Sequence, residues 1–126
     1  LSQVKVVARA MYSNPAIYGS RVVSSVLGDS NLEAQWRADI VTMSSRIKAM
    51  RQRLVDELKK AGSTRDWSHL TNQIGMFSFT GMTKPQCERL TNEFHIYLTM
   101  NGRISMAGVT EGNVAYLARA MHEVTK

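Results

Sequence analysis

Apolar residues recur every three or four positions through the first half of the chain, which is the spacing of one face of an α-helix. The pattern predicts a helix at the start of the chain, a break at residues 13–15 and a second helix that ends near Gly28. Asn14 can cap the second helix, and Pro15 suits its first turn because proline lacks a backbone N–H. We therefore expect two helices within the first 29 residues, separated by a break at residues 13–15.

The longest periodic stretch covers residues 30–61. Ser30 and Glu33 have the spacing of a capping box, and Gly62 is a typical helix terminator. The apolar stripe between them consists of Leu32, Trp36, Ile40, Met43, Ile47, Met50, Leu54 and Leu58. Such a helix is about 48 Å long, whereas a compact chain of this size is about 36 Å across. Because the steps are irregular rather than heptad, a helix that links two parts of a larger protein is favoured over a coiled coil.

Short alternating segments follow Gly62. Residues 74–80 and 95–99 have the pattern of strands, and Asn101-Gly102 is a strong hairpin signal that leads into a third strand over 103–106. Between the first two strands, Thr83 and Gln86 form a capping box for a helix through Phe94, and Thr110 opens a last helix. The inward face of that last helix holds Val114, Leu117, Ala118 and Met121. We expect this part to be a βαββα unit, a small α+β layer.

Charge and composition narrow the classes of partner. The chain has 16 Lys and Arg against 10 Asp and Glu, a net charge of +6. The basic residues are interleaved with acids, which favours a solvated surface over a nucleic-acid-binding patch. One cysteine and three scattered histidines are no basis for a disulfide framework or a zinc site. No apolar run approaches the roughly 18 residues of a membrane helix, so we expect no nucleic acid, no membrane and no metal as a partner.

Spacing alone yields few catalytic candidates. The sequence has no Gly-rich phosphate loop and no nucleophile elbow. His69 follows Trp67 and is expected to cap or stack, and Cys87 is expected to be an inert thiol although it lies early in a helix. Arg103, on a hairpin strand, has a rigid fork suited to a carboxylate, but spacing alone favours a solvent-facing arginine. Arg9 is interpreted in the same way, as a cation near a helix C-terminus.

Three motifs change the interpretation of these arginines. They are RAMYSNP over residues 9–15, WSHLTNQIGMFSFTG over 67–81 and NGRISMAG over 101–108. In this order and spacing, the chain resembles over essentially its whole length the C-terminal part of the aspartate aminotransferases, homodimeric pyridoxal-phosphate enzymes of fold type I. The resemblance implies transfer of an amino group between L-aspartate and 2-oxoglutarate by a ping-pong mechanism, with dicarboxylic amino and 2-oxo acids as substrates.

The resemblance also implies roles for five residues. Arg103 would bind the substrate α-carboxylate as a bidentate pair, and Arg9 would bind the distal carboxylate in the neighbouring subunit's site. Phe77 would lie near the substrate entrance, and Ser13 and Asn14 at the subunit boundary. Two arginine forks suit a dicarboxylate because each guanidinium offers planar, two-point recognition.

A division into domains is implied as well. Residues 1–29 would end the large cofactor domain, 30–61 would connect the domains, and 62–126 would form most of the C-terminal small domain. The segment would thus be an α+β part of an α/β fold type I transferase. In the family, the lysine that forms the Schiff base with pyridoxal phosphate lies upstream of this region. We therefore expect that residues precede Leu1 and that the 126-residue segment alone is inactive, with no catalytic residue of its own.

The sequence also suggests a cellular compartment and leaves two alternative functions open. The basic balance and the ending His122-Glu-Val-Thr-Lys126 are most similar to mitochondrial members, so the mitochondrial matrix is expected, with the cytoplasm and the plastid as alternatives. A basic nucleic-acid module would show clustered lysines and exposed aromatics. An independently processed interaction or inhibitory fragment without catalysis would fold alone, as a monomer or a coiled-coil dimer.

Overall fold

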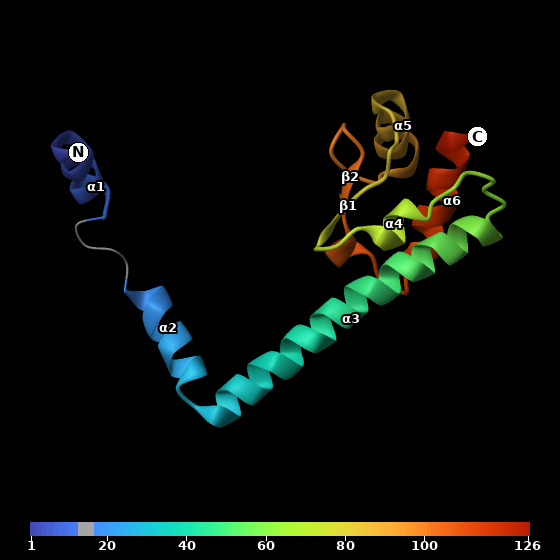
Figure 1. Cartoon of the computed structure of the whole chain (residues 1–126). Coiled ribbons are helices and arrows are strands. Elements are labelled where there is room, and N and C mark those ends of the chain that lie inside the picture. Colours follow the sequence, from blue (N-terminus) through green and yellow to red (C-terminus); the bar gives the residue numbers. More distant parts are fainter. Residues whose placement is uncertain (13–16) are drawn as a thin grey trace. The chain divides into compact units, whose positions relative to one another are not determined.

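The structure of the chain, a computed structural model, describes residues 1–12 and 17–126. The described residues form two compact units, Leu1–Val41 and Thr42–Lys126. The elements in chain order are α1 (Ser2–Tyr12), α2 (Tyr18–Leu27), α3 (Ser30–Lys60), α4 (His69–Asn72), β1 (Phe77–Phe79), α5 (Lys84–Phe94), β2 (Arg103–Ser105), the 3₁₀ helix η1 (Met106–Gly108) and α6 (Val114–Thr125) (Figure 1).

The first unit is helical, as the sequence predicts. It contains α1, α2 and the beginning of α3. α2 ends at Gly28, whose N–H donates to the Ser24 carbonyl at 2.9 Å. The predicted cap at Asn14 and Pro15 lies outside the described residues. Neither α1 nor α2 buries a residue within this chain.

One helix of 31 residues, α3, occupies almost the whole predicted range 30–61. Its N-terminal cap is Asp29, so the predicted capping box of Ser30 and Glu33 is wrong. Asp29 Oδ1 accepts the backbone N–H groups two and three residues later at 2.8 and 3.1 Å. An aspartate satisfies these donors and also complements the positive end of the helix. Glu33 instead forms a salt bridge with Arg37 at 2.7 Å.

The predicted C-terminus of α3 is confirmed in detail. Gly62 has φ +86°, the left-handed conformation that glycine adopts at little cost. Its N–H donates to the Lys59 carbonyl at 3.0 Å, and the Ser63 N–H donates to the Leu58 carbonyl at 3.1 Å. These two bonds form a Schellman motif, which satisfies carbonyls that the helix itself leaves unpaired.

The core of the second unit is one cluster of buried residues to which α3, α4, α5, β2, η1 and α6 contribute. Of the predicted α3 stripe, Met50, Leu54 and Leu58 are buried and Ile47 is partly buried. The first four stripe residues, Leu32, Trp36, Ile40 and Met43, are exposed in this chain. The predicted inward residues of α6, which are Val114, Leu117, Ala118 and Met121, are all buried. Each fully buried aliphatic side chain stabilises the unit by about 2 kcal/mol.

The sheet is smaller than the sequence predicts. β1 and β2 pair antiparallel, with Phe77 opposite Ser105, Ser78 opposite Ile104 and Phe79 opposite Arg103. The predicted strand over 74–80 is shortened at its start because Gly75 has φ +88°, which interrupts an extended chain. At the other end, Met106 leaves the strand predicted over 103–106 and begins η1.

The predicted strand over 95–99 is wrong, and with it the expected βαββα order. His95 ends α5 in the left-handed conformation with φ 54°. The Ile96 N–H then donates back to the Leu90 carbonyl at 3.0 Å, so this segment closes the helix instead of joining a ladder. β2 pairs with β1, which lies before α5 in sequence. The observed order is therefore β1, α5, β2, η1 and α6.

The last helix begins later than predicted. α6 starts at Val114, whose N–H donates to the Thr110 carbonyl at 2.9 Å. The Asn113 side chain stabilises the preceding turn, because its Oδ1 accepts the Thr110 N–H at 2.8 Å and its Nδ2 donates to the Gly108 carbonyl at 2.9 Å. Thr110 therefore opens a turn, and the helix follows it.

The turn predicted at Asn101-Gly102 is present and is sterically demanding. Gly102 has φ +84°, and a Cβ at this position would lie 3.0 Å from the Met82 carbonyl oxygen and 3.0 Å from Thr80 Oγ1. We expect Gly102→Ala to lower the free energy of unfolding of the intact protein by about 2–3 kcal/mol, since backbone strain and a close contact add. Urea unfolding measures this.

Gly62→Ala is the matched control, because Gly62 has nearly the same φ, +86°, and open space around its Cβ position. We expect it to cost about 1 kcal/mol, the cost of the left-handed conformation alone. Equal decreases in the free energy of unfolding in the two variants would contradict a role for the close contact at Gly102.

Candidate functional site

The two strands present one face to the core and one to the outside. Ser78 and Ile104 are buried on the inner face, whereas Phe77, Phe79 and Arg103 are exposed on the outer face. This division follows from the two-residue period of a strand. The outer face therefore places one guanidinium among aromatic rings.

Arg103 stacks on Phe77, so the structure brings two of the predicted site residues together. The guanidinium carbon lies 3.8 Å from the centroid of the Phe77 ring. In the register of the sheet, Arg103 is directly opposite Phe79, which makes Phe77 its diagonal neighbour. A cation over a ring face is attracted by the ring quadrupole, and the contact limits the orientations of the fork.

The backbone of Arg103 is held on both sides by the preceding turn. Its N–H donates to Asn101 Oδ1 at 3.2 Å. Its carbonyl accepts hydrogen bonds from the Thr99 N–H at 3.2 Å and from Thr99 Oγ1 at 3.0 Å. The guanidinium is therefore carried by a fixed piece of main chain, which favours precise placement of its donors.

An open groove of about 400 Å³ runs beside this arginine; its lining residues are Phe77, Tyr97, Leu98, Thr99, Arg103, Ile104 and Ser105. Arg103 is the one charged residue of that lining. Among the residues that the structure describes, no carboxylate forms a salt bridge with it. The fork is thus available to an external anion, and a planar carboxylate matches it with two parallel hydrogen bonds.

The other predicted site residues belong to the first part of the chain. Arg9 lies in the last turn of α1, in the first unit, and its side chain is exposed. Ser13 and Asn14 lie outside the described residues. The helix C-terminal position of Arg9 agrees with the sequence prediction.

The His69 ring stacks, as the sequence favours, and the Cys87 side chain is shielded from solvent. The His69 ring stacks on Trp67 with 6.0 Å between centroids, and its Nε2 lies 3.2 Å from the Thr80 carbonyl oxygen. The Cys87 side chain is fully buried, and burial raises the pKa of its thiol. A protonated, inaccessible thiol is a poor nucleophile.

Two polar side chains that sequence reasoning missed hold β1 in place. Arg51 of α3 is buried and donates to the Phe77 carbonyl at 2.7 Å and to Ser78 Oγ at 2.9 Å. Gln73 Oε1 accepts the Phe79 N–H at 2.7 Å, and its Nε2 donates to the Phe79 carbonyl at 2.9 Å. The one available signal was that Arg51 directly follows Met50 of the apolar stripe, a position that borders the buried face.

Residues 1–12 and 17–126 contain neither a candidate metal site nor a candidate membrane-spanning helix. No three His, Cys, Asp or Glu side chains come together as a group that could hold a metal ion. None of the described helices combines the length and the apolar character that a membrane crossing requires.

Comparisons with known proteins cover nearly the whole chain. The family model of aminotransferase class I and II matches residues 1–121. The mitochondrial aspartate aminotransferase of Dictyostelium discoideum is 58% identical over 125 residues, which are 99% of this chain and 29% of that protein. The chain thus spans less than a third of the length of this curated relative.

Solved structures agree with the sequence matches. A mitochondrial aspartate aminotransferase from Trypanosoma brucei superposes with a TM-score of 0.92 at 50% identity, over 99% of this chain and 33% of that chain. An aromatic-amino-acid aminotransferase from Burkholderia pseudomallei, covalently bound to pyridoxal phosphate, gives a TM-score of 0.92 at 44% identity, over 100% of this chain and 32% of that one. The fold described above is therefore that of one region of these larger enzymes.

Proposed function

The chain belongs to the aminotransferase class I and II family, and from this premise we propose that it is the C-terminal segment of an aspartate aminotransferase. In the intact enzyme, the amino group passes between L-aspartate and 2-oxoglutarate by a ping-pong mechanism. The observation that carries the proposal is the Arg103 fork, which stands over Phe77 in an open groove without a described acidic partner.

The role of Arg103 is to bind the α-carboxylate that the amino and 2-oxo acid substrates share. A carboxylate that approaches the groove can accept two N–H groups of the guanidinium in one plane. The Phe77 ring supports one face of the guanidinium, with its centroid 3.8 Å from the guanidinium carbon, and leaves the N–H edge open to the carboxylate. Two-point binding fixes the direction of the Cα bonds relative to the reacting groups, which favours proton transfer at that carbon.

Arg9, Ser13 and Asn14 extend the proposal to a homodimer. Arg9 would bind the distal carboxylate of the dicarboxylic substrate in the neighbouring subunit's site, with Ser13 and Asn14 at the subunit boundary. The exposed position of Arg9 at the end of α1 supports this role, since a side chain that serves another subunit must extend away from its own helix.

Pyridoxal phosphate is the proposed cofactor, and when bound it carries the amino group between the two half-reactions. The groove beside Arg103 has no lysine in its lining. The family resemblance implies that the lysine that attaches the cofactor lies outside this segment. We therefore assign the attachment of the cofactor to residues outside this segment, and to this segment the binding of substrate carboxylates.

Three regions share these tasks. Residues 1–29 would end the large domain, 30–61 would connect it to the small domain, and 62–126 would form most of the small domain. The exposed apolar residues of α1, α2 and the first half of α3 support this division, because many exposed apolar side chains are typical of elements that pack against another part of a protein. The mitochondrial matrix is the proposed compartment, after the mitochondrial relatives named above.

The direct test is activity of the intact protein that contains this segment. Purified with pyridoxal phosphate, it is expected to form glutamate from 2-oxoglutarate when aspartate is supplied. Activity should vanish on removal of the cofactor and return when it is restored. Turnover of an aromatic amino acid without turnover of aspartate would contradict the substrate class, and no turnover of either would contradict the whole proposal.

A further inference from the structure

Arg51 of α3 is a buried cation whose hydrogen-bond acceptors are all neutral. Its side chain is 3% exposed. Nη1 donates to the Leu70 carbonyl at 2.7 Å and to Ser78 Oγ at 2.9 Å, and Nη2 donates to the carbonyls of Gly75 at 2.9 Å and Phe77 at 2.7 Å. Within the described part of the chain, no carboxylate forms a salt bridge with it. Burial lowers the pKa of this guanidinium, a sign of the desolvation that its four bonds must offset.

These four bonds fix the segment that leads into β1. Residues 73–76, between α4 and β1, form neither helix nor strand. The carbonyls of such a segment need partners when they face a core. Arg51 supplies partners at three carbonyls and one hydroxyl, and so ties the start of β1 to the rigid helix α3.

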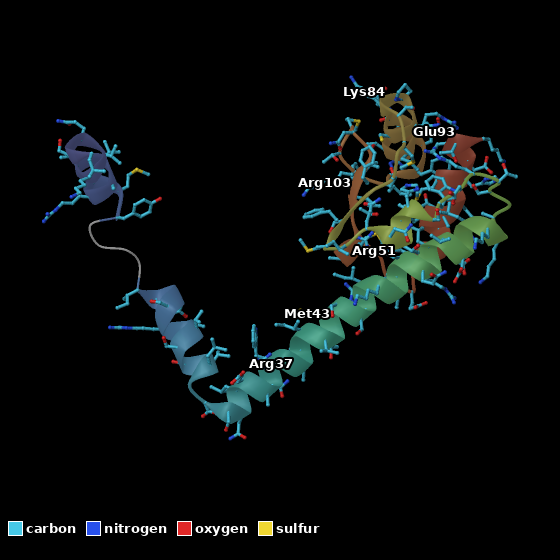
Figure 2. The ribbon with its side chains drawn as sticks, in the orientation of Figure 1. Arg37, Met43, Arg51, Lys84, Glu93 and Arg103 are labelled. Carbon is cyan, nitrogen blue, oxygen red and sulfur yellow. The ribbon has the colours of Figure 1, made fainter. Side chains whose placement is uncertain are left out.

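The same short strand carries Phe77 on its outer face. Ser78 and the Phe77 carbonyl contact Arg51 on the inner side, and the Phe77 ring supports the Arg103 guanidinium on the outer side at 3.8 Å. Figure 2 labels Arg51 on the side of α3 that faces the strands, and Arg103 beside the strands. A shift of the Phe77 backbone therefore moves the surface on which the Arg103 fork rests.

We propose that Arg51 is a positioning residue for Arg103, acting through the Phe77 backbone that it holds at 2.7 Å. This inference rests on the proposed function, because it assigns to Arg51 the orientation of the fork that binds the α-carboxylate. It is distinct from a role in stability alone. Loss of stability reduces the amount of folded enzyme, whereas misorientation of the fork weakens carboxylate binding in the enzyme that is folded.

The test uses the full-length holoenzyme with Arg51→Lys, since a lysine keeps the charge but cannot reproduce a planar fork with four bonds. We expect the KM for aspartate to rise about tenfold and kcat to fall as well, because a misplaced fork weakens the carboxylate contacts and misdirects the Cα bonds. The KM for alanine should rise by the same factor, since the two amino acids share the α-carboxylate.

Arg53→Lys is the matched control, because Arg53 is a half-exposed arginine on the same helix with surface ion pairs to Glu57 at 3.4 Å and Glu111 at 3.8 Å. Its KM values should not change.

A spectroscopic measurement separates this inference from the proposed function. An arginine stacked on a phenyl ring has side-chain proton resonances that the ring current shifts upfield. The resonances of Arg103 can be identified because they disappear from the spectrum of Arg103→Lys. We expect Arg51→Lys to reduce the upfield shift of Arg103, whatever substrate the enzyme uses. Ser78→Ala removes one acceptor of Arg51 and should cause a smaller change in the same direction, so it decides the matter if Arg51→Lys does not fold.

Two outcomes would overturn the positioning role: unchanged KM values with a lower melting temperature, or an unchanged Arg103 resonance. A reduced upfield shift in an enzyme that does not transaminate aspartate would instead contradict the proposed function and leave the coupling between Arg51 and Arg103 standing.

Discussion

Arg103→Ala is expected to lower kcat/KM for both aspartate and 2-oxoglutarate by roughly 10²- to 10⁴-fold in the intact enzyme. Two hydrogen bonds between a guanidinium and a carboxylate are together worth about 3–5 kcal/mol, and each 1.36 kcal/mol corresponds to about tenfold in rate. Both substrates should be affected because both carry the carboxylate that Arg103 is proposed to bind. Steady-state kinetics with aspartate and with 2-oxoglutarate as the varied substrate measure this loss.

Arg65→Ala is the matched control for this variant. Arg65 also stacks on an aromatic ring, with its guanidinium carbon 4.7 Å from the centroid of Trp67, but it does not line the groove beside Arg103. Its removal should leave kcat/KM within about threefold of the original value, as is usual for a surface substitution. The absorbance of the bound cofactor should be the same in both variants. Normal turnover of aspartate by Arg103→Ala would disprove the carboxylate-binding role.

Local signals in the sequence predicted the elements whose ends depend on neighbouring residues. The capping box of Thr83 and Gln86 is present, with the Thr83 N–H donating to Gln86 Oε1 at 2.8 Å, and Gly62 ends α3 as expected. These features involve a few consecutive residues, so no knowledge of the remaining fold is needed. At the start of α3, two acceptable caps were adjacent in sequence, and Asp29 rather than Ser30 provides the hydrogen bonds.

The sequence predictions are wrong where contacts between distant parts of the chain determine the structure. Residues 95–99 alternate like a strand, but His95 turns into the left-handed region, and β2 pairs with β1 across the intervening helix α5. Arg51 was overlooked because an arginine in a helix is normally solvated, and its burial depends on carbonyls 19 to 26 residues away. Periodicity contains no information on such partners.

The same distinction between local and long-range information applies to the candidate site. Spacing alone favoured a solvent-facing Arg103, and the side chain is exposed as that interpretation requires. What spacing could not supply is the Phe77 ring beneath it, since the diagonal contact depends on the register of the two strands. The three motifs supplied the expected roles because they contain both residues, although the motifs themselves specify no geometry.

Arg9→Asp is expected to invert the preference of the intact enzyme from dicarboxylic toward cationic amino acids. If Arg9 binds the distal carboxylate of aspartate, an aspartate at this position repels that group and attracts the ammonium or guanidinium of lysine or arginine. We expect kcat/KM for aspartate to fall roughly 10³-fold or more, since an attractive ion pair becomes a repulsive one, a change of about 4 kcal/mol or more. The ratio of kcat/KM for aspartate to kcat/KM for arginine measures the change.

Lys5→Asp distinguishes direct contact from a general effect of charge. Lys5 lies four residues before Arg9 on α1, so both occupy the same face of one helix and both substitutions reverse one positive charge. A long-range electrostatic effect would change the substrate preference in both variants and would weaken as salt is added. Direct binding of the distal carboxylate by Arg9 predicts that Lys5→Asp keeps the preference for aspartate. Selectivity that survives in Arg9→Asp, or is lost equally in the two variants, would remove Arg9 from the substrate site.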